Sequence, residues 1–138
     1  MVNNIQISEK RSIDKEQVLY LYRQNRWSSA DKPEELMQAL KASHSLVTAW
    51  DGDKLVGLAN SISDGYLVVY YPHLLVLPEY QGKGIGRMIM QRLQEKYSSF
   101  HQQTLFADGD AVEFYKKCGF MKAGACLAMW IYKGHDHD

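Results

Sequence analysis

A continuous stretch from residue 74 to residue 97 constrains the fold more than any other part of the chain. Leu74 to Leu77 form an uninterrupted apolar run, which is typical of a strand covered on both faces. Pro78 ends this strand, because proline has no N–H to donate to a neighbouring strand. Beyond a loop, apolar side chains recur at the spacing of one helical face, at Ile85, Ile89 and Leu93. The sequence therefore predicts a buried strand, a tight loop and an amphipathic helix, in this order.

The loop between the predicted strand and helix has glycine at every second position, at Gly82, Gly84 and Gly86. Glycine permits tight backbone turns and allows a ligand to approach the main chain closely. The first N–H groups of the following helix have no partner within the helix and lie at the positive end of its dipole. Together these features indicate a binding site for phosphate or pyrophosphate, to which Lys83 and Arg87 add positive charge. The alternative is a tight turn without a ligand, and the spacing fits neither the dinucleotide-binding nor the Walker pattern.

Two motifs in the chain resemble those of one family. Residues 81–86, Gln-Gly-Lys-Gly-Ile-Gly, fit the pattern Q/R-x-x-G-x-G/A and resemble the acetyl-CoA-binding motif of the GNAT N-acetyltransferases. Residues 114–120, Phe-Tyr-Lys-Lys-Cys-Gly-Phe, resemble the F-Y-x-x-x-G-F segment of the same family. The resemblance spans most of the chain, but its specific motifs are confined to these two stretches. It implies the GNAT-like acyl-CoA N-acyltransferase fold, an α/β (α+β) fold in which a central, mixed, twisted sheet of about six to seven strands has helices on both faces.

Length and composition indicate one globular domain. We expect this domain to cover residues 1–138, with a disordered tail at 134–138. The formal net charge is zero, so we expect neither nucleic acid nor a membrane as a partner. No apolar run reaches the length of a membrane span, and no signal peptide follows Met1. Cys118 and Cys126 are expected to be free thiols, which makes the cytoplasm the predicted location.

Local signals predict the remaining elements of the fold. Asp14 is expected to cap a first helix with Gln17 as its capping-box partner, and Asp110 is expected to cap a last helix that ends at residue 117. A second helix is expected to begin near Pro33. Pro72 falls within the third strand of a predicted meander and indicates a bulge or irregular bend there. Strands are expected at 5–7, 45–50, 54–62, 66–77, 103–107 and 128–132.

The resemblance implies that the chain uses acetyl-CoA. By position, the backbone of Leu74, Leu75 and Val76 would pair with the pantetheine arm as a neighbouring strand would. An N–H group in this segment would also stabilise the charge that develops on the thioester oxygen. The reaction would be direct attack of a primary amine on the thioester in a ternary complex. The pyrophosphate would be held by N–H groups of the loop residues Gln81, Gly82, Lys83, Gly84, Ile85, Gly86 and Arg87.

Three side chains are candidates for contact with the reacting groups. Tyr115 matches the tyrosine that is the general acid in many GNAT enzymes, and the alternative is an aromatic packed under the last strands. His73 is the only histidine near the reacting strand and is therefore a candidate base, with a structural or surface role as the alternative. Trp27 lies in a loop that borders the acceptor site in the family, so it either contacts the substrate or caps the core.

Two classes of function remain open on sequence alone. The first is an acetyl-CoA-dependent N-acetyltransferase acting on a small amine, an amino-sugar antibiotic or a peptide N-terminus. The second is a catalytically degenerate acyl-CoA-binding module that acts as a sensor or scaffold. His73 and Asp108 keep the second class open, because many family members carry an aspartate at the first position and an asparagine at the second. A domain for another phosphate ligand would require that both motif matches be accidental.

Other sites in the sequence are weaker candidates. Cys118 and Cys126 lack an adjacent histidine that could activate either as an acetyl-carrying nucleophile. The run His-Asp-His-Asp at 135–138 has ligand chemistry but lies at a chain end, so we expect no metal. Homodimers are common in the family, often through the terminal strands, and the apolar run at 128–132 allows a homodimer. Four aromatic residues could line a site that binds cations: Trp27, Tyr66, Tyr70 and Tyr71. The alternative is that the tyrosines are ordinary core or surface residues of strands.

Overall fold

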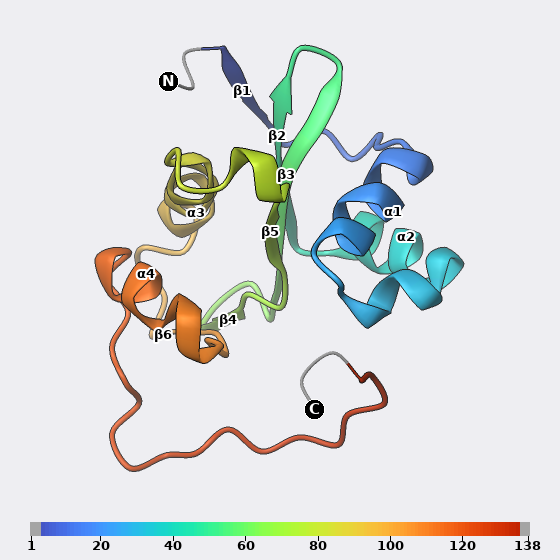
Figure 1. Cartoon of the computed structure of the whole chain (residues 1–138). Coiled ribbons are helices and arrows are strands. Elements are labelled where there is room, and N and C mark those ends of the chain that lie inside the picture. Colours follow the sequence, from blue (N-terminus) through green and yellow to red (C-terminus); the bar gives the residue numbers. More distant parts are fainter. Residues whose placement is uncertain (1–3, 136–138) are drawn as a thin grey trace.

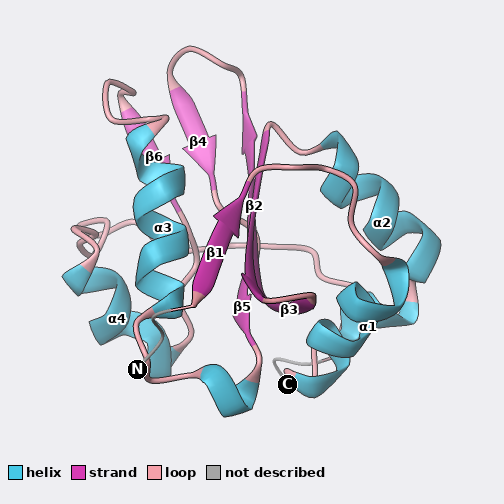
Figure 2. Cartoon of the chain, turned by 90° about the horizontal axis from the view of Figure 1, so that it is seen from above, coloured by secondary structure: helices cyan, strands magenta, loops and turns pink. Residues whose placement is uncertain are grey.

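A mixed sheet of six strands forms the centre of the protein, with two helices on each side. The computed structural model describes residues 4–135. The strands are β1 (Ile5–Ser8), β2 (Ser45–Asp51), β3 (Lys54–Ser63), β4 (Val68–Tyr70), β5 (Leu74–Val76) and β6 (Gln102–Thr104). The helices are α1 (Lys15–Gln24), α2 (Pro33–Ala42), α3 (Ile85–Glu95) and α4 (Val112–Lys117), with short 3-10 helices η1 (Ser28–Asp31), η2 (Pro78–Tyr80) and η3 (Gly109–Ala111). In Figures 1 and 2, α1 and α2 lie on one side of the sheet and α3 and α4 on the other, which confirms the predicted fold class.

The sheet is antiparallel over most of its width and has one parallel pair at one side. β1, β2, β3 and β4 follow one another as antiparallel neighbours. β6 pairs in parallel with β4, since the chain returns across the sheet through α3 before it reaches β6. The predicted second helix begins at Pro33, as expected for proline in a first helical turn.

The third strand of the predicted meander is split into two short strands that both pair with β3. Ile62 pairs with Tyr70 of β4, whereas Ala59 pairs with Leu74 of β5. Pro72 lies in the interruption between them, which confirms the predicted irregularity. β6 runs beside β4 and does not pair with β5. Within the described part of the chain, one edge of β5 therefore has no neighbouring strand.

Helix α3 is held against the sheet by an apolar stripe and by a glycine in the strand beneath it. The predicted stripe is confirmed, because Ile85, Ile89 and Leu93 are all buried. A Cβ atom added at Gly57 of β3 would lie 2.8 Å from the Cδ1 atom of Ile89. Such close packing fixes the position of α3, and with it the position of the glycine loop at its N-terminus.

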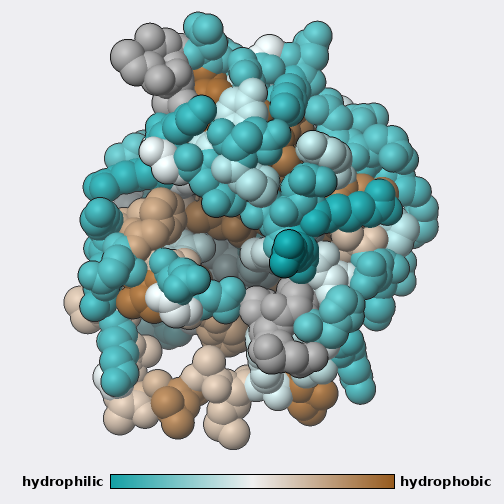
Figure 3. All heavy atoms as spheres, viewed as in Figure 1, coloured by the Kyte–Doolittle hydropathy of each residue, from teal (hydrophilic) through white to brown (hydrophobic). Residues whose placement is uncertain are grey.

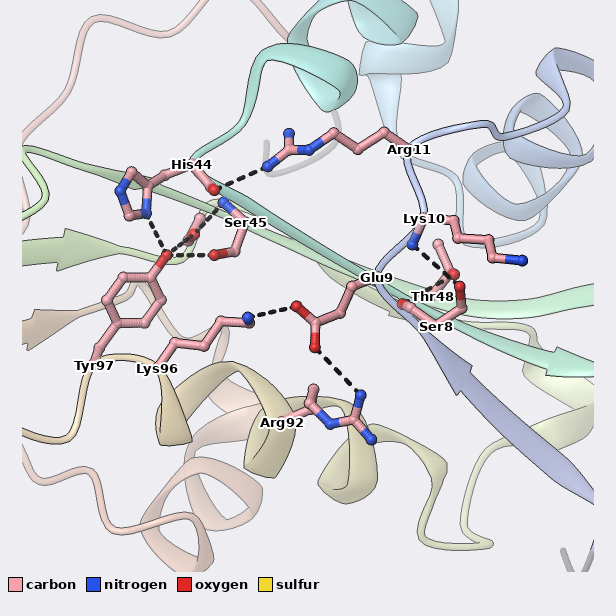
Figure 4. A network of polar contacts seen from close by, with 11 residues as sticks. Ser8, Glu9, Lys10, Arg11, His44, Ser45, Thr48, Arg92, Lys96 and Tyr97 are labelled. Atoms are coloured by element: carbon pink, nitrogen blue, oxygen red, sulfur yellow. Dashed lines mark hydrogen bonds and ion pairs between the residues drawn. The ribbon is translucent and has the colours of Figure 1, made fainter.

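A buried polar cluster joins the end of α3 to β2 and β3 (Figure 4). The Tyr97 hydroxyl lies 2.7 Å from Nδ1 of His44 and 2.7 Å from the Oγ atoms of both Ser45 and Ser61. Ser45 and Ser61 are cross-strand partners in the β2–β3 pairing. Tyr97 is 1% exposed, so its hydroxyl depends on these partners instead of on water.

The predicted cap of α1 is confirmed in part. The carboxylate of Asp14 accepts a hydrogen bond from the backbone N–H of Gln17 at 3.0 Å. The return bond of a capping box is absent from the hydrogen bonds of Gln17: its side-chain amide donates to the carbonyl of Asp53 and accepts from the N–H of Leu55. That part of the prediction was wrong, because the β2–β3 turn offers backbone partners that the local sequence does not reveal.

The predicted cap of the last helix was also wrong. Asp110 lies within η3, and α4 begins two residues later at Val112. Ala111 occupies the capping position and makes no side-chain hydrogen bond. The 3-10 turn supplies the bend at the start of α4, so no aspartate cap is needed there.

The last predicted strand, at 128–132, is not formed. After α4 the chain crosses the lower part of Figure 1 as an irregular segment. Large apolar side chains of this segment are exposed, and Figure 3 shows apolar atoms along the same lower edge. The strand prediction was wrong because high strand propensity needs a neighbouring strand to pair with, and within the described residues β6 pairs with β4 alone.

The chain end contributes one described contact. Residues 136–138, which include most of the predicted tail and of the His-Asp run, lie outside the described residues. Nε2 of His135 lies 3.1 Å from Oδ2 of Asp31. In the part of the chain from residue 4 to residue 135, we find no helix with the length and apolar character of a membrane span.

Candidate functional site

The direction of the backbone groups along β5 determines which of them can reach a ligand. Leu77 donates its N–H to Val56 at 2.8 Å, and Asn60 donates its N–H to the carbonyl of His73 at 3.3 Å. Because backbone groups alternate along a strand, Leu75 also faces β3. The backbone N–H and carbonyl groups of Leu74 and Val76 therefore point to the free edge of β5.

This alternation corrects the prediction for Leu75. Its backbone pairs with Leu58 of β3 and cannot also pair with a pantetheine arm. At the free edge, the carbonyl of Val76 accepts from side-chain amides of Asn25 at 3.1 Å and Gln81 at 2.9 Å. The groups that face outward for a ligand are therefore those of Leu74 and the N–H of Val76.

The glycine loop adopts a conformation that other residues avoid. Gly82 has a φ of +77° and Gly84 has a φ of +88°, both in the left-handed region. Gly84 is the N-cap of α3 and provides no side chain for the first N–H groups of that helix. A Cβ atom at Gly84 would meet nothing within 4 Å, so the space above the loop is open. These N–H groups are thus available to an anion.

A cavity of about 570 Å³ lies in front of this loop, between the free edge of β5 and α4. We call it the loop cavity. Its lining includes all the predicted cofactor residues except Lys83, whose Nζ lies over the Tyr80 ring at 5.5 Å from the centroid. At Gly86, a Cβ atom would lie 3.3 Å from the ring of Phe114 in α4, so a larger residue would require this ring to shift by a few tenths of an ångström. The lining residues are Asn25, Leu74, Leu75, Val76, Tyr80, Gln81, Gly82, Gly84, Ile85, Gly86, Arg87, Asp110, Ala111, Phe114, Tyr115 and Lys117.

A second cavity of about 360 Å³ adjoins the split between β4 and β5. We call it the aromatic cavity. It brings together His73, Tyr115 and Trp27, the three side chains that the sequence proposed for contact with reacting groups. Tyr115 lines both cavities and therefore stands at their junction. The other lining residues are Ser29, Tyr70, Tyr71, Pro72, Leu74, Phe106, Ala107, Asp108, Ala111, Trp130 and Tyr132.

Tyr115 is held at this junction by the turn that ends α4. Gly119 has a φ of +98°, which lets the chain reverse so that the N–H of Phe120 donates to the carbonyl of Tyr115 at 3.0 Å. Burial raises the pKa of Tyr115 to about 12, and the nearby Cys118 and Asp108 act in the same direction. The phenol therefore stays protonated at neutral pH and can donate a hydrogen bond.

His73 is anchored from two sides. Its backbone N–H donates to Oδ1 of Asn60 at 3.2 Å, and its ring Nδ1 lies 2.7 Å from the hydroxyl of Tyr22. Two arrangements satisfy the ring contact, with either Tyr22 or Nδ1 as the donor. Only donation by Nδ1 leaves Nε2 unprotonated, as a base requires.

The chain matches the family described as "Acetyltransferase (GNAT) domain" over residues 9–128. It belongs to the GNAT acetyltransferase family. It is 34% identical to a GNAT-family acetyltransferase, SP0256 of Streptococcus pneumoniae, with a TM-score of 0.82 over 94% of this chain and 98% of that chain. Protein SA2161 of Staphylococcus aureus is 26% identical, with a TM-score of 0.83 over 93% of this chain and 98% of that one.

Curated relatives match over shorter stretches. The N-acetyltransferase ycf52 of Pyropia yezoensis, named as uncharacterized, is 37% identical over 81 residues, which are 56% of this chain and 47% of that protein. The chain thus spans less than half the length of that relative, and the match covers about half of this chain.

The loop cavity of this GNAT domain fits acetyl-CoA on its own geometry. The open, side-chain-free N-terminus of α3 can bind a pyrophosphate, and the free edge of β5 can pair with an extended arm. Both features line the same cavity, and Tyr115 is also part of its lining. When bound, acetyl-CoA would supply an acetyl group activated as a thioester.

The cysteines of this GNAT domain have no sign of activation. Cys118 is partly buried and Cys126 is exposed, and neither lines the aromatic cavity. Burial raises the pKa of the Cys118 thiol, although Arg87 opposes this effect. A thiol with a raised pKa is a poor nucleophile at neutral pH, which argues against a covalent acetyl-enzyme. Among residues 4–135, no group of three or more His, Cys, Asp or Glu side chains could hold a metal ion.

Several residues of the aromatic cavity were missed by sequence reasoning. Asp108 was noted only as a departure from the family pattern, and Phe106 was treated as part of a strand. Trp130 and Tyr132 come from the irregular C-terminal segment. The rings of these two residues stack on each other, with their centroids 4.4 Å apart. Their two-residue spacing within an apolar run was the only available signal, and it was interpreted as a strand. Tyr66, by contrast, is 84% exposed and does not line the cavity.

Proposed function

We propose that this GNAT protein transfers the acetyl group of acetyl-CoA to a primary amine of a small molecule or peptide. The observation that carries the proposal is the position of Tyr115, which lines both the loop cavity and the aromatic cavity. A donor bound along β5 and an acceptor bound among the aromatic side chains would meet at its hydroxyl. A binding module that only holds acyl-CoA would have no use for a second cavity at that point.

The chain provides a group for each step of direct transfer. The outward N–H of Val76 or Leu74 can stabilise negative charge on the thioester oxygen. As the amine nitrogen bonds to the acetyl carbon, the C–S bond breaks and Tyr115 donates its proton to the departing sulfur. The pKa of a thiol is about 8.5, so this sulfur needs only a weak acid. The amine loses one proton to a base or to water.

CoA release with a panel of primary amines tests the proposal. The purified chain should release CoA from acetyl-CoA only when an amine is present, and the acetylated amine should be found by mass spectrometry. Binding of acetyl-CoA without turnover of any amine in a broad panel would instead support the sensor or scaffold. Absence of acetyl-CoA binding to the folded protein would contradict both.

We propose His73 as the base, acting through Nε2 while Nδ1 donates to Tyr22. His73 lines the aromatic cavity together with Tyr115. Replacement of His73 by Gln keeps an amide in its place but cannot accept the proton, so the acidic limb of the kcat/KM profile should move and kcat should fall by at least about 100-fold. Tyr22→Phe is the companion variant, because it removes only the contact at Nδ1. An unchanged pH–rate profile in His73→Gln would show that the proton leaves by another route.

We also propose that the protein forms a homodimer through its C-terminal segment. Leu127, Met129 and Ile131 are 83%, 88% and 94% exposed, and their spacing places them on one face of an extended chain. Exposed apolar groups of this size favour burial against a partner. Sedimentation analysis should give a dimer that Ile131→Ser weakens, with Lys122→Ser as a surface control. A monomer at every concentration would refute the dimer.

A further inference from the structure

The aromatic cavity has features that restrict its ligand, and this inference about the ligand rests on the proposed function. We propose that the acceptor is a compact amine carried on an aromatic ring and that it has no phosphate or carboxylate.

Much of the cavity lining is aromatic. Trp27 lies edge-on to His73, with ring centroids 5.1 Å apart. Phe106 lies 5.5 Å from Tyr70 and 6.5 Å from Trp130, again between ring centroids. Aromatic walls favour a flat aromatic ligand through stacked or edge-on contacts.

The charge of the lining selects against anions. Asp108 is the one acidic residue in the lining, and none of the lining residues is Lys or Arg. A phosphate or carboxylate would find no cation there and would be repelled by Asp108. The charge of Asp108 reaches Tyr115, since it contributes to the raised pKa of that phenol. An ammonium group drawn to Asp108 would therefore lie close to the proposed reaction centre.

The volume excludes a large acceptor. At about 360 Å³ the cavity is near the lower end of the range of about 300–1,000 Å³ for small-molecule sites. A single ring with a short aminoalkyl chain fits this space better than a peptide or an amino-sugar antibiotic with several rings. With one carboxylate in the lining, one ammonium group is matched, whereas a diamine would leave its second charge in an apolar setting.

The test compares probes that differ by one group. Turnover is measured as CoA release with butylamine, 2-phenylethylamine, phenylalanine, putrescine and glucosamine 6-phosphate. We expect kcat/KM for 2-phenylethylamine to exceed that for butylamine by about tenfold, because of the aromatic walls. Phenylalanine differs from 2-phenylethylamine only by its carboxylate, and its kcat/KM should be lower by about 100-fold.

A matched pair of variants assigns the discrimination against carboxylates to its residue. Asp108→Asn should raise KM for 2-phenylethylamine and narrow the gap to phenylalanine. Glu113→Gln, on the exposed face of α4, is the control, because it removes a nearby charge outside the cavity. It should leave unchanged both the KM for 2-phenylethylamine and the difference in kcat/KM between 2-phenylethylamine and phenylalanine.

Binding measurements separate failure of this inference from failure of the proposed function. Calorimetric titration of the protein–CoA complex with the same amines measures recognition without turnover. Selective binding of the aromatic amines without CoA release would overturn the proposed transfer and leave the ligand class standing. Equal binding and turnover of phenylalanine, or a preference for butylamine, putrescine or glucosamine 6-phosphate, would overturn the ligand class.

Discussion

Replacement of Tyr115 by phenylalanine is expected to lower kcat by at least about 100-fold, the usual contribution of a positioned general acid. The substitution removes one hydroxyl at the junction of the two cavities and retains the ring that packs against Phe114 and Phe120. The KM for acetyl-CoA should change little, because the cofactor would be bound mainly by the loop and by β5. Steady-state kinetics with a saturating amine measures both quantities.

The pH dependence gives the same prediction a second readout. With a pKa of about 12, the Tyr115 phenol is protonated throughout the neutral and mildly alkaline range. Its proton is lost only above that pKa, so the native enzyme should show no alkaline loss of activity from this group below pH 10. Over that range the rate should rise as the amine substrate, with a pKa of about 10.4, loses its proton. Tyr20→Phe, on the exposed side of α1, is the matched control and should leave kcat unchanged. A Tyr115→Phe enzyme with native kcat would show that the departing sulfur is protonated by water.

Replacement of Gly84 by glutamate is expected to weaken acetyl-CoA binding by more than about 100-fold, measured by calorimetric titration. A carboxylate at the start of α3 would stand where the pyrophosphate is proposed to bind, and like charges about 4 Å apart repel by about 1–4 kcal/mol depending on the local dielectric. The φ of +88° adds backbone strain for any residue with a Cβ atom.

Gly84→Asn separates the two effects, since asparagine tolerates the left-handed region better and carries no charge. It should bind acetyl-CoA more tightly than Gly84→Glu, and circular dichroism should show that both variants are folded. Native affinity in Gly84→Glu would mean that the anionic part of the cofactor binds elsewhere.

The part of the site that sequence reasoning could predict is the part encoded by local signals. The strand, glycine loop and helix from residue 74 to residue 97 each carry their own signal, so β5, the loop and α3 could be placed before the structure was known. The pairing of Leu75 with β3 could not, because the direction of its backbone depends on its register with Leu58 of β3, which lies in a different part of the sequence.

The aromatic cavity could not be predicted, because its walls come from distant segments. Trp27 follows α1, Tyr70 ends β4, Phe106 follows β6, and Trp130 belongs to the C-terminal segment. Only the tertiary fold brings these rings together, and no local pattern marks them as neighbours. The strand predicted at 128–132 failed for the same reason, since strand propensity is decided by the partner and not by the segment itself.

The buried hydroxyl of Tyr97 favours one register between β2 and β3, because it contacts a serine on each strand. A slip of one residue between β2 and β3 would turn Ser61 to the opposite face of the sheet and remove it from the buried hydroxyl. A buried hydroxyl that loses its partners costs about 1–3 kcal/mol, so misaligned chains would be at a disadvantage during folding. The residue before Ser61 is Asn60, whose side chain holds the backbone of His73. The β2–β3 register that pairs Ser45 with Ser61 therefore also sets the position of His73 in the aromatic cavity.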